Sequence, residues 1–406
     1  MHEPVAITDG IFWIGVDDRE TALFEALWPL PEGVSYNAYM IKDEKIALID
    51  TVKRGFLDNY LDKVSAICDC QDVDYLIINH MEPDHSGSIR QLLTLHPELK
   101  IVGNKKTAEF LAGYYGVTEN VIEVADKEEI SLGRYKLRFY HTPMVHWPET
   151  MMSFEETSGT IFSGDAFGGF GALDGGIFDD EVDVSLFEYE ILRYFSNIVG
   201  KFSPMVQKAL TKVKDLEIKI IAPTHGPVWR ENPGYIFNAY DRWSRHVTEP
   251  GAVVVYGSMY TNTQKMAEAV ARGLALAGVK QVKVCNSAVT HISDIIADIW
   301  RYKGLALGSC TYDVQLFPPM AHLVSMLKSK QMKERSLGIF GSYGWSGGAV
   351  KGLKEFAESP GWELVEPVVE SHCAPKEGAL ILMTRSFSLV PPLCTMGLNL
   401  PTMLEK

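Results

Sequence analysis

The 406-residue sequence lacks the marks of several large classes of protein. Its six cysteines include no C-x-x-C pair, so a zinc ribbon, a rubredoxin centre or a cysteine-held cluster is not expected. No run of about 18 apolar residues is present, and we therefore expect no membrane-spanning helix. The opening residues, MHEPVAITDG, contain neither the basic nor the apolar region of a signal peptide. Together with scattered thiols, this predicts a cytoplasmic protein.

Positive charge is also scarce. Lysine and arginine number 38 against 52 acidic residues, which gives a formal net charge of −14. Nucleic acids and anionic membranes attract positively charged surfaces, so neither is an expected partner. An acidic surface suits a soluble protein partner that carries a basic docking patch.

Two nucleotide-binding fingerprints are missing as well. The sequence contains no P-loop ending in Gly-Lys-Ser/Thr, which argues against a nucleoside triphosphate site. It contains no G-x-G-x-x-G motif, which argues against a dinucleotide site. If the protein performs redox chemistry, its electrons therefore have to come from a separate carrier or reductase.

The length predicts two or three domains at about 150 residues each. In the first part of the chain, short apolar runs alternate irregularly with helical patterns, which favours a layered α/β or α+β domain. A proline-glycine break at Glu249-Pro250-Gly251 predicts a boundary, with domains over residues 1–249 and 250–406. Beyond it strands and helices alternate regularly, which is typical of a doubly wound parallel sheet.

The end of the chain departs from this regularity. Residues 374–406 lack the amphipathic pattern of the helix that normally closes such a sheet. We therefore expect an atypical tail there and a less well covered second sheet.

Four potential metal ligands, His80, Glu82, Asp84 and His85, follow the apolar run 75–78. Pro83 among them forces the chain to turn, and a turning backbone can aim alternate side chains at two neighbouring points. The segment therefore predicts either two metal ions or one metal ion with a neighbouring base.

Three more residues of the same types, His146, Asp165 and His225, each follow an apolar run. A single histidine of this kind is more often a surface or hydrogen-bonded residue than a ligand. Strand ends at one edge of a sheet converge in space, however, and the seven residues together predict a binuclear site built from loops.

The pattern resembles the metallo-β-lactamase superfamily, in which the first ligand motif is H-x-H-x-D-H. Glu82 replaces the second histidine, and in this the chain resembles the flavodiiron proteins, whose H-x-E-x-D-H motif and three later ligands are all matched. The resemblance implies that His80, Glu82 and His146 hold one iron and that Asp84, His85 and His225 hold the other, with Asp165 bridging. It also implies that the first domain is a metallo-β-lactamase-like αβ/βα sandwich.

The donor set supports a redox metal independently of the resemblance. Four imidazoles and three carboxylates suit iron or manganese at least as well as zinc. Zinc has no redox chemistry and would serve a hydrolase instead. A zinc-dependent hydrolase with an accessory flavodoxin domain is the alternative, and an electron shuttle with an inert first domain is a third, weaker one.

Three loops in the second part of the chain follow strand-like runs. The first is rich in hydroxyls and precedes a helix, which fits a single terminal phosphate, although hydroxyl residues also cap helices generally. The other two contain glycines and aromatic residues that can flank a flat ring. The candidate contacts are Ser258, Met259, Tyr260, Thr261, Asn262 and Thr263; Ser309, Thr311, Tyr312 and Asp313; and Ser342, Tyr343, Gly344, Trp345, Gly347 and Gly348.

These loops resemble those of flavodoxin, so the resemblance implies FMN, with its phosphate in the first loop and its ring against Tyr312 and Trp345. Tyr343 could equally be a packing residue. The fusion of the two modules implies an oxidoreductase that reduces O2 to water, NO to N2O, or both, and that receives electrons from a rubredoxin-like carrier or a flavin reductase. It further implies a head-to-tail homodimer or a dimer of dimers. One departure is the early loop Leu23 to Trp28, which lacks a histidine found in many family members.

Overall fold

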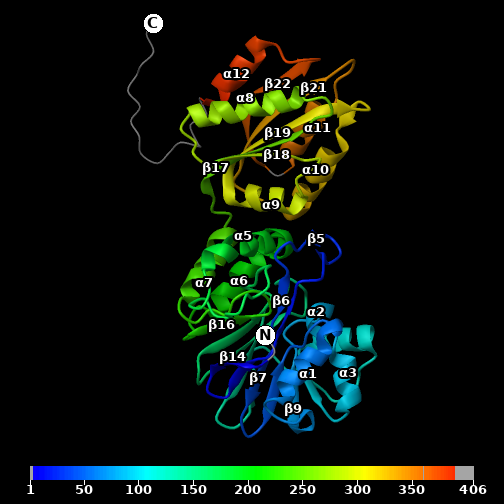
Figure 1. Ribbon diagram of the computed structural model, residues 1–406, viewed down its shortest axis with the longest axis vertical. Coiled ribbons are helices and arrows are strands. Elements are labelled where there is room, and N and C mark those ends of the chain that lie inside the picture. Colours follow the sequence, from blue (N-terminus) through cyan, green and yellow to red (C-terminus); the bar gives the residue numbers. More distant parts are fainter. Residues whose placement is uncertain (1–2, 360, 389–406) are drawn as a thin grey trace. The chain divides into compact units, whose positions relative to one another are not determined.

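In the computed structural model, which describes residues 3–359 and 361–388, the chain divides into two units, Met1–Arg245 and His246–Lys406 (Figure 1). Glu249 to Gly251, where the sequence predicts the domain boundary, are the first residues of strand β17 (Glu249–Gly257).

The first unit contains two large sheets. The seven-stranded sheet has the order β1 (Val5–Thr8), β2 (Ile11–Trp13), β7 (Tyr39–Lys42), β8 (Ile46–Ile49), β9 (Val73–Ile77), β10 (Lys100–Gly103) and β11 (Val121–Glu123). The five-stranded sheet has the order β12 (Glu129–Ser131), β13 (Lys136–His141), β14 (Met151–Glu155), β15 (Thr160–Gly164) and β16 (Ile220–Pro223).

The two sheets pack face to face. The Tyr39 ring of β7 lies 5.1 Å from the Phe162 ring of β15, and the Tyr39 hydroxyl donates a hydrogen bond to the Pro223 carbonyl of β16 at 2.6 Å. In Figure 1, helices α1 (Leu57–Ser65) and α3 (Ile89–Leu95) lie on the side of the seven-stranded sheet, whereas α6 (Ser203–Val213) and α7 (Pro233–Ser244) lie on the side of β16. The expected αβ/βα sandwich is confirmed.

The second unit is a parallel sheet covered by helices. The strand order is β18 (Val282–Asn286), β17, β19 (Tyr302–Tyr312), β21 (Ser336–Tyr343) and β22 (Glu363–His372), and only the short β20 (Gln315–Leu316) pairs antiparallel, with β19. The helices are α8 (Asn262–Leu276), α9 (Ile292–Arg301), α10 (Pro318–Lys330), α11 (Ala349–Glu358) and α12 (Glu377–Ser388). The first strand lies between the second and third, which is the order of a flavodoxin-like doubly wound sheet, as expected.

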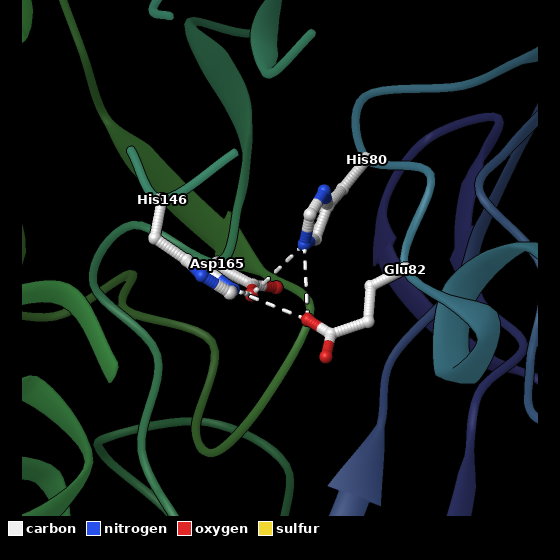
Figure 2. A group of neighbouring side chains, drawn as sticks. All are labelled: His80, Glu82, His146 and Asp165. Atoms are coloured by element: carbon white, nitrogen blue, oxygen red, sulfur yellow. Dashed lines mark hydrogen bonds and ion pairs between the residues drawn. The ribbon is translucent and has the colours of Figure 1, made fainter. Parts of the chain in front are cut away.

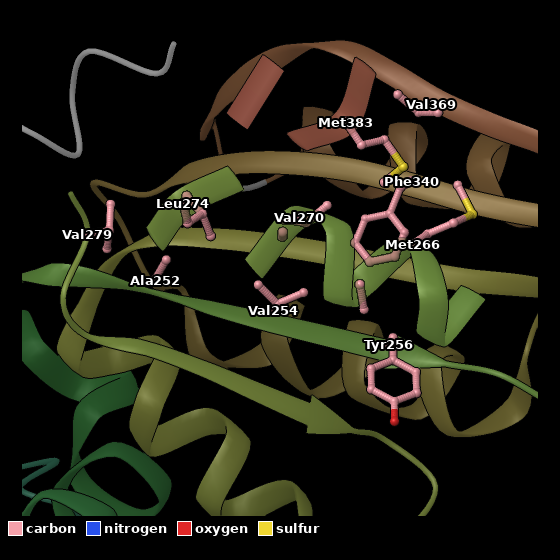
Figure 3. Packing of buried hydrophobic residues seen from close by; sticks show 12 residues of the cluster. Ala252, Val254, Tyr256, Met266, Val270, Leu274, Val279, Phe340, Val369 and Met383 are labelled. Atoms are coloured by element: carbon pink, nitrogen blue, oxygen red, sulfur yellow. The ribbon is translucent and has the colours of Figure 1, made fainter. Parts of the chain in front are cut away.

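The expectation of a missing closing helix is wrong. Helix α12 packs beside α8, and Met383 is completely buried in a cluster with Met266, Val270 and Phe340 (Figure 3). The sequence does not predict this helix because α12 packs on α8 partly through a close approach of the two backbones. The usual stripe of apolar side chains is correspondingly incomplete. A Cβ on Gly273 of α8 would lie 2.4 Å from the Thr384 carbonyl oxygen. Residues 389–406 of the expected tail lie outside the described part of the chain.

None of the described helices combines the length and the apolar character that crossing a lipid bilayer requires.

Candidate metal centre

All seven predicted ligands come together at one edge of the first unit. Each lies on a segment that follows a strand: β9, β13, β15 or β16. Within each of two groups the potential donor atoms lie within 4.8 Å of one another: His80, Glu82, His146 and Asp165 in the first, and Asp84, His85 and His225 in the second. Hereafter these are the first and second groups.

Local backbone geometry explains how one short segment serves both groups. Glu82 has extended backbone angles, φ −57° and ψ 140°, and precedes the four-residue helix α2 (Pro83–Ser86). Pro83 occupies the first turn of this helix, where its missing N–H leaves no hydrogen bond unmade. The turn expected at Pro83 is therefore the start of a helix, which sends Asp84 and His85 away from Glu82.

The first group is compact and buried (Figure 2). Oε2 of Glu82 lies 3.2 Å from Nε2 of His80 and 3.1 Å from Nε2 of His146. Oδ2 of Asp165 lies 3.4 Å from Nε2 of His80 and 3.0 Å from Nε2 of His146. The four donor atoms thus surround a common point.

The second group is built around two imidazoles that face each other. The Nε2 atoms of His85 and His225 are 3.1 Å apart, and Oδ2 of Asp84 lies 3.3 Å and 3.4 Å from them. Neither carboxylate oxygen of Asp84 has a hydrogen-bond partner in the described structure. Buried carboxylate oxygens normally have one, so this arrangement fits a bound cation.

Asp165, a member of the first group, also contacts the second group. Its Oδ2 faces the first group, while its Oδ1 lies 3.1 Å from Nε2 of His85 in the second. The hydroxyl of Thr224 donates a hydrogen bond to Oδ1 at 2.6 Å and fixes the plane of the carboxylate. A carboxylate in this position is suited to bridge two metal ions.

The buried carboxylates of the cluster favour positive charge on or between the imidazoles. Burial alone would lower the pKa of His146, yet the carboxylates of Asp165 and Glu82 raise it to about 9. Burial likewise opposes protonation of His80, but Asp165 and Glu149 hold its pKa well above the usual value. Conversely, His80 and His85 outweigh the effect of burial and hold the pKa of Asp165 well below its usual value. Two metal ions would supply this charge and leave the imidazoles neutral for coordination.

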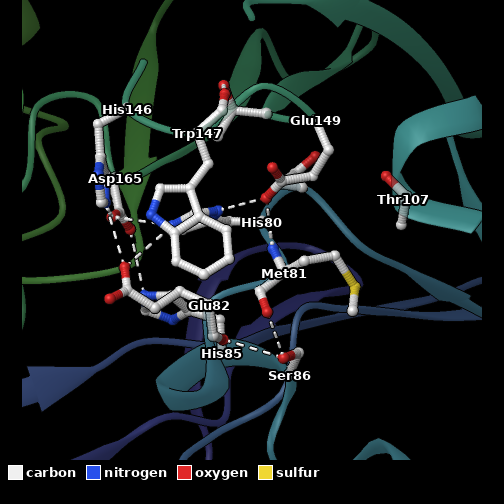
Figure 4. Close-up of polar contacts among 12 residues, drawn as sticks. His80, Met81, Glu82, His85, Ser86, Thr107, His146, Trp147, Glu149 and Asp165 are labelled. Atoms are coloured by element: carbon white, nitrogen blue, oxygen red, sulfur yellow. Dashed lines mark hydrogen bonds and ion pairs between the residues drawn. The ribbon is translucent and has the colours of Figure 1, made fainter. Parts of the chain in front are cut away.

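The groups that contact the Nδ1 atoms of the candidate ligands His80 and His225 were not predicted from the sequence. Oε1 of Glu149 lies 2.8 Å from Nδ1 of His80 and accepts a hydrogen bond from the backbone N–H of Met81 at 2.9 Å (Figure 4). Nδ1 of His225 instead lies 2.7 Å from the Ser35 carbonyl oxygen. The only sequence signal for Glu149 was its place three residues after His146, in the phrase His-Trp-Pro-Glu.

The early loop also reaches the cluster. Glu25 has a left-handed backbone with φ 49° and accepts a hydrogen bond from the Trp28 indole at 3.0 Å. Burial and the neighbouring Glu82 carboxylate raise the pKa of Glu25. An acidic residue of this loop, Glu25, therefore lies against the candidate ligand Glu82. From the sequence, the loop was noted only because it departs from the family pattern.

The three predicted flavin loops meet at the carboxyl edge of the second sheet. Gly257 pairs with Ser309, and Ser309 pairs with Gly341, so the loops begin side by side. Oγ1 of Thr263, from the first loop, lies 3.0 Å from Oγ of Ser342, from the third. Ligands of such sheets bind at this edge, outside the carboxyl ends of the strands.

The side chains of these loops fall into two kinds. The side chains of Tyr260 and Trp345 are 82% and 87% exposed. Large exposed rings of this kind are available to contact a flat ligand. The Ser309 hydroxyl, in contrast, donates to the Cys310 carbonyl and accepts from the Phe317 N–H. Tyr343 packs on the His372 ring at 5.2 Å, so the structure gives it a packing contact.

Three other predicted contacts lie where the loops turn or touch one another. Thr261 is the N-cap residue of α8 and has a left-handed backbone, so the first loop turns directly into a helix N-terminus. Such an N-terminus presents free backbone N–H groups to an anion. Thr311 accepts a hydrogen bond from the Ala349 N–H, and a Cβ on Gly348 would lie 2.0 Å from the Val314 carbonyl oxygen, so the second and third loops touch.

Comparison with known families divides the chain in the same way. Residues 34–226 match the model of the ODP family beta lactamase, and residues 254–383 match that of flavodoxin. The nitric oxide reductase of Moorella thermoacetica is 36% identical over 369 residues, which are 90% of this chain and 92% of that protein.

Solved structures agree over nearly the whole length. Rubredoxin oxygen:oxidoreductase from Desulfovibrio gigas matches with a TM-score of 0.91 and 28% identity, over 95% of this chain and 98% of that one. The flavodiiron protein of Giardia intestinalis also matches with a TM-score of 0.91 and 28% identity, over 95% of each chain. With two facing groups of metal-binding side chains in one unit and a flavodoxin sheet in the other, this chain belongs to the flavodiiron protein family, whose members are oxidoreductases with FMN and a pair of iron ions as cofactors.

Proposed function

We propose that this protein reduces O2 to water, NO to N2O, or both, at a diiron centre supplied with electrons by FMN. The observation that carries the proposal is the position of Asp165 between two complete groups of nitrogen and oxygen donors. The relatives give the two candidate substrates, since one is named nitric oxide reductase and another rubredoxin oxygen:oxidoreductase.

In this proposal His80, Glu82 and His146 would hold one iron, and Asp84, His85 and His225 would hold the other. Asp165 would be the shared ligand, since its Oδ2 faces the first group and its Oδ1 the second. Mixed imidazole and carboxylate donors suit iron, whereas an all-histidine first triad would have favoured zinc.

Two ferrous ions and a two-electron flavin together supply the four electrons that O2 needs to become water, while coupling of two NO needs only two. The residues of the chain keep this chemistry out of bulk water. His80, His85, Asp165 and His225 are all 0% exposed. A buried, low-dielectric site strengthens the attraction between its carboxylates and bound cations.

The flavin loops hold the second cofactor. We propose that Ser258, Thr263 and the N-terminus of α8 bind the FMN phosphate, and that Tyr312 and Trp345 flank its ring. The segment from Ser258 to Gln264 contains no lysine or arginine, so hydroxyl groups and backbone N–H groups would bind the phosphate.

The electron donor and the assembly are also proposals. Since the sequence has no nicotinamide fingerprint, the donor we propose is a rubredoxin-like protein or a flavin reductase in the cytoplasm. We further propose a head-to-tail homodimer, or a dimer of such dimers, in which the flavin of one chain serves the irons of its partner. Mixed dimers of an iron-deficient and a flavin-deficient variant, confirmed by mass, should then recover activity, whereas inactive mixed dimers would place electron transfer within one chain.

The direct test is turnover with a chemically reduced rubredoxin as donor, started by adding either NO or O2 to protein kept under inert gas. NO consumption with N2O formation, or O2 consumption without release of hydrogen peroxide, would support the proposal, and the ratio of the two rates gives the preference. Iron-loaded, FMN-loaded protein that consumes neither gas would contradict it.

A further inference from the structure

A buried carboxylate contacts the Nδ1 atom of His80, a candidate ligand of the first group. Glu149 is 0% exposed, and its Oε1 lies 2.8 Å from Nδ1 of His80. The same oxygen accepts the backbone N–H of Met81 at 2.9 Å. Its other oxygen, Oε2, has no hydrogen-bond partner in the described structure.

The position of Glu149 is fixed from a neighbouring helix. Nδ2 of Asn104 donates a hydrogen bond to the Glu149 carbonyl oxygen. Asn104 is also the N-cap of helix α4 (Lys105–Phe110), where its Oδ1 accepts the N–H groups of Lys106 and Thr107. The backbone that carries this carboxylate is therefore held by the N-terminus of a helix.

The second group has no such support. Nδ1 of His225 lies against a neutral carbonyl oxygen, that of Ser35, at 2.7 Å. Nδ1 of His85 has no hydrogen-bond partner among the described residues. Among His80, His85 and His225, only His80 has a carboxylate against its Nδ1 atom.

We propose that Glu149 is a positioning residue that makes the two metal positions unequal, an inference that rests on the proposed diiron function. By accepting the Nδ1 proton of His80, it directs Nε2 toward the metal and makes the imidazole a stronger donor. Its negative charge, for which the described structure offers no cationic partner other than His80, also favours the higher oxidation state nearby. The first position should thus hold its iron more firmly and remain ferric when dithionite has reduced only one iron of the pair.

A purely structural role is the competing explanation, because Glu149 also caps the Met81 N–H. Glu149→Gln separates the two roles. Glutamine retains an oxygen that can accept from both His80 and Met81, but it removes the charge. The matched control is Glu155→Gln, since Glu155 is equally buried and its carboxylate accepts hydrogen bonds from Lys136, Thr157 and Ser158, none of which is a candidate ligand.

The measurements are iron release to a chelator and the Mössbauer spectrum of ⁵⁷Fe-loaded, FMN-replete protein, recorded oxidised and after titration with dithionite to one ferrous ion per chain. The wild type should show one slowly and one rapidly released iron. In Glu149→Gln the slow iron should be bound on the order of 10- to 100-fold more weakly, and only its spectrum should change, while Glu155→Gln should match the wild type. Equal release of both irons from the wild type, or unchanged release from Glu149→Gln, would overturn the inference.

A measurement on the unchanged sequence covers the case in which the variant does not fold. In zinc-loaded wild-type protein labelled with ¹⁵N-histidine, one Nδ1 proton should resonate well downfield of the other histidine protons, as a proton shared with a carboxylate does. The absence of such a proton would overturn the inference. A wild type that binds no iron at all would instead contradict the proposed function itself.

Discussion

The Thr224 hydroxyl donates a 2.6 Å hydrogen bond to Oδ1 of Asp165, the oxygen that faces the second group of candidate ligands. The two residues come from neighbouring parallel strands, since Asp165 follows β15 and Thr224 follows β16. The sheet therefore helps to set the orientation of the Asp165 carboxylate, which we propose as the bridging ligand.

Replacement of Asp165 by alanine should abolish reduction of both gases and lower the iron content, while FMN stays bound. Two adjacent cations would lose their shared anion, which is electrostatically unfavourable. Thr224→Val, which keeps the shape but removes the donor, should weaken iron binding by roughly 10-fold. Iron analysis and turnover check both variants, and wild-type iron content in Asp165→Ala would rule out the bridging role.

The Ser258→Ala, Thr263→Ala double variant should lose FMN but keep its iron. The hydroxyl groups lie at the carboxyl edge of the second sheet, and Thr263 also contacts Ser342 across that edge. The flavin absorbance that remains after extensive dialysis, together with iron content, is the readout. Full retention of FMN would show that the phosphate does not depend on these hydroxyls.

Gly273→Ala should destabilise the second unit by about 1–3 kcal/mol, because the new methyl group would meet the Thr384 carbonyl and separate α8 from α12. Gly378→Ala is the matched control in α12, since a Cβ there has no atom within 4 Å. That variant should be neutral or slightly more stable. Urea unfolding measures both, and equal stabilities would contradict the close packing of the two helices.

His246 should make the second unit less stable in acid. Burial, together with the positive charges of Arg335 and Lys333, lowers the pKa of His246 to about 4 from its ordinary 6.5. Between these values the unfolded chain binds a proton that the folded chain does not, so stability falls as the pH decreases from about 7 to 4. His246→Asn, which tolerates the left-handed backbone at this position, should reduce this decrease. An identical pH dependence of urea unfolding in variant and wild type would refute the assignment.

The candidate ligands were predictable because metal binding needs particular residue types, and His80 to His85 concentrate four of them in six positions. The fold class of each domain followed from apolar runs and from the resemblance. Glu149 and Thr224 were not predictable, since each acts through a contact with a residue more than fifty positions away along the chain. Helix α12 was not predicted because its packing depends partly on Gly273 of α8, where the absence of a side chain lets the two backbones approach.

The central claim is that two groups of donors joined by Asp165 hold two irons in a chain that also binds FMN. Metal analysis of the purified protein, combined with its visible and Mössbauer spectra, tests this most directly. We predict about two iron ions and one FMN per chain, with spectra of a coupled iron pair. Stoichiometric zinc without flavin would contradict the account and would indicate a hydrolase instead.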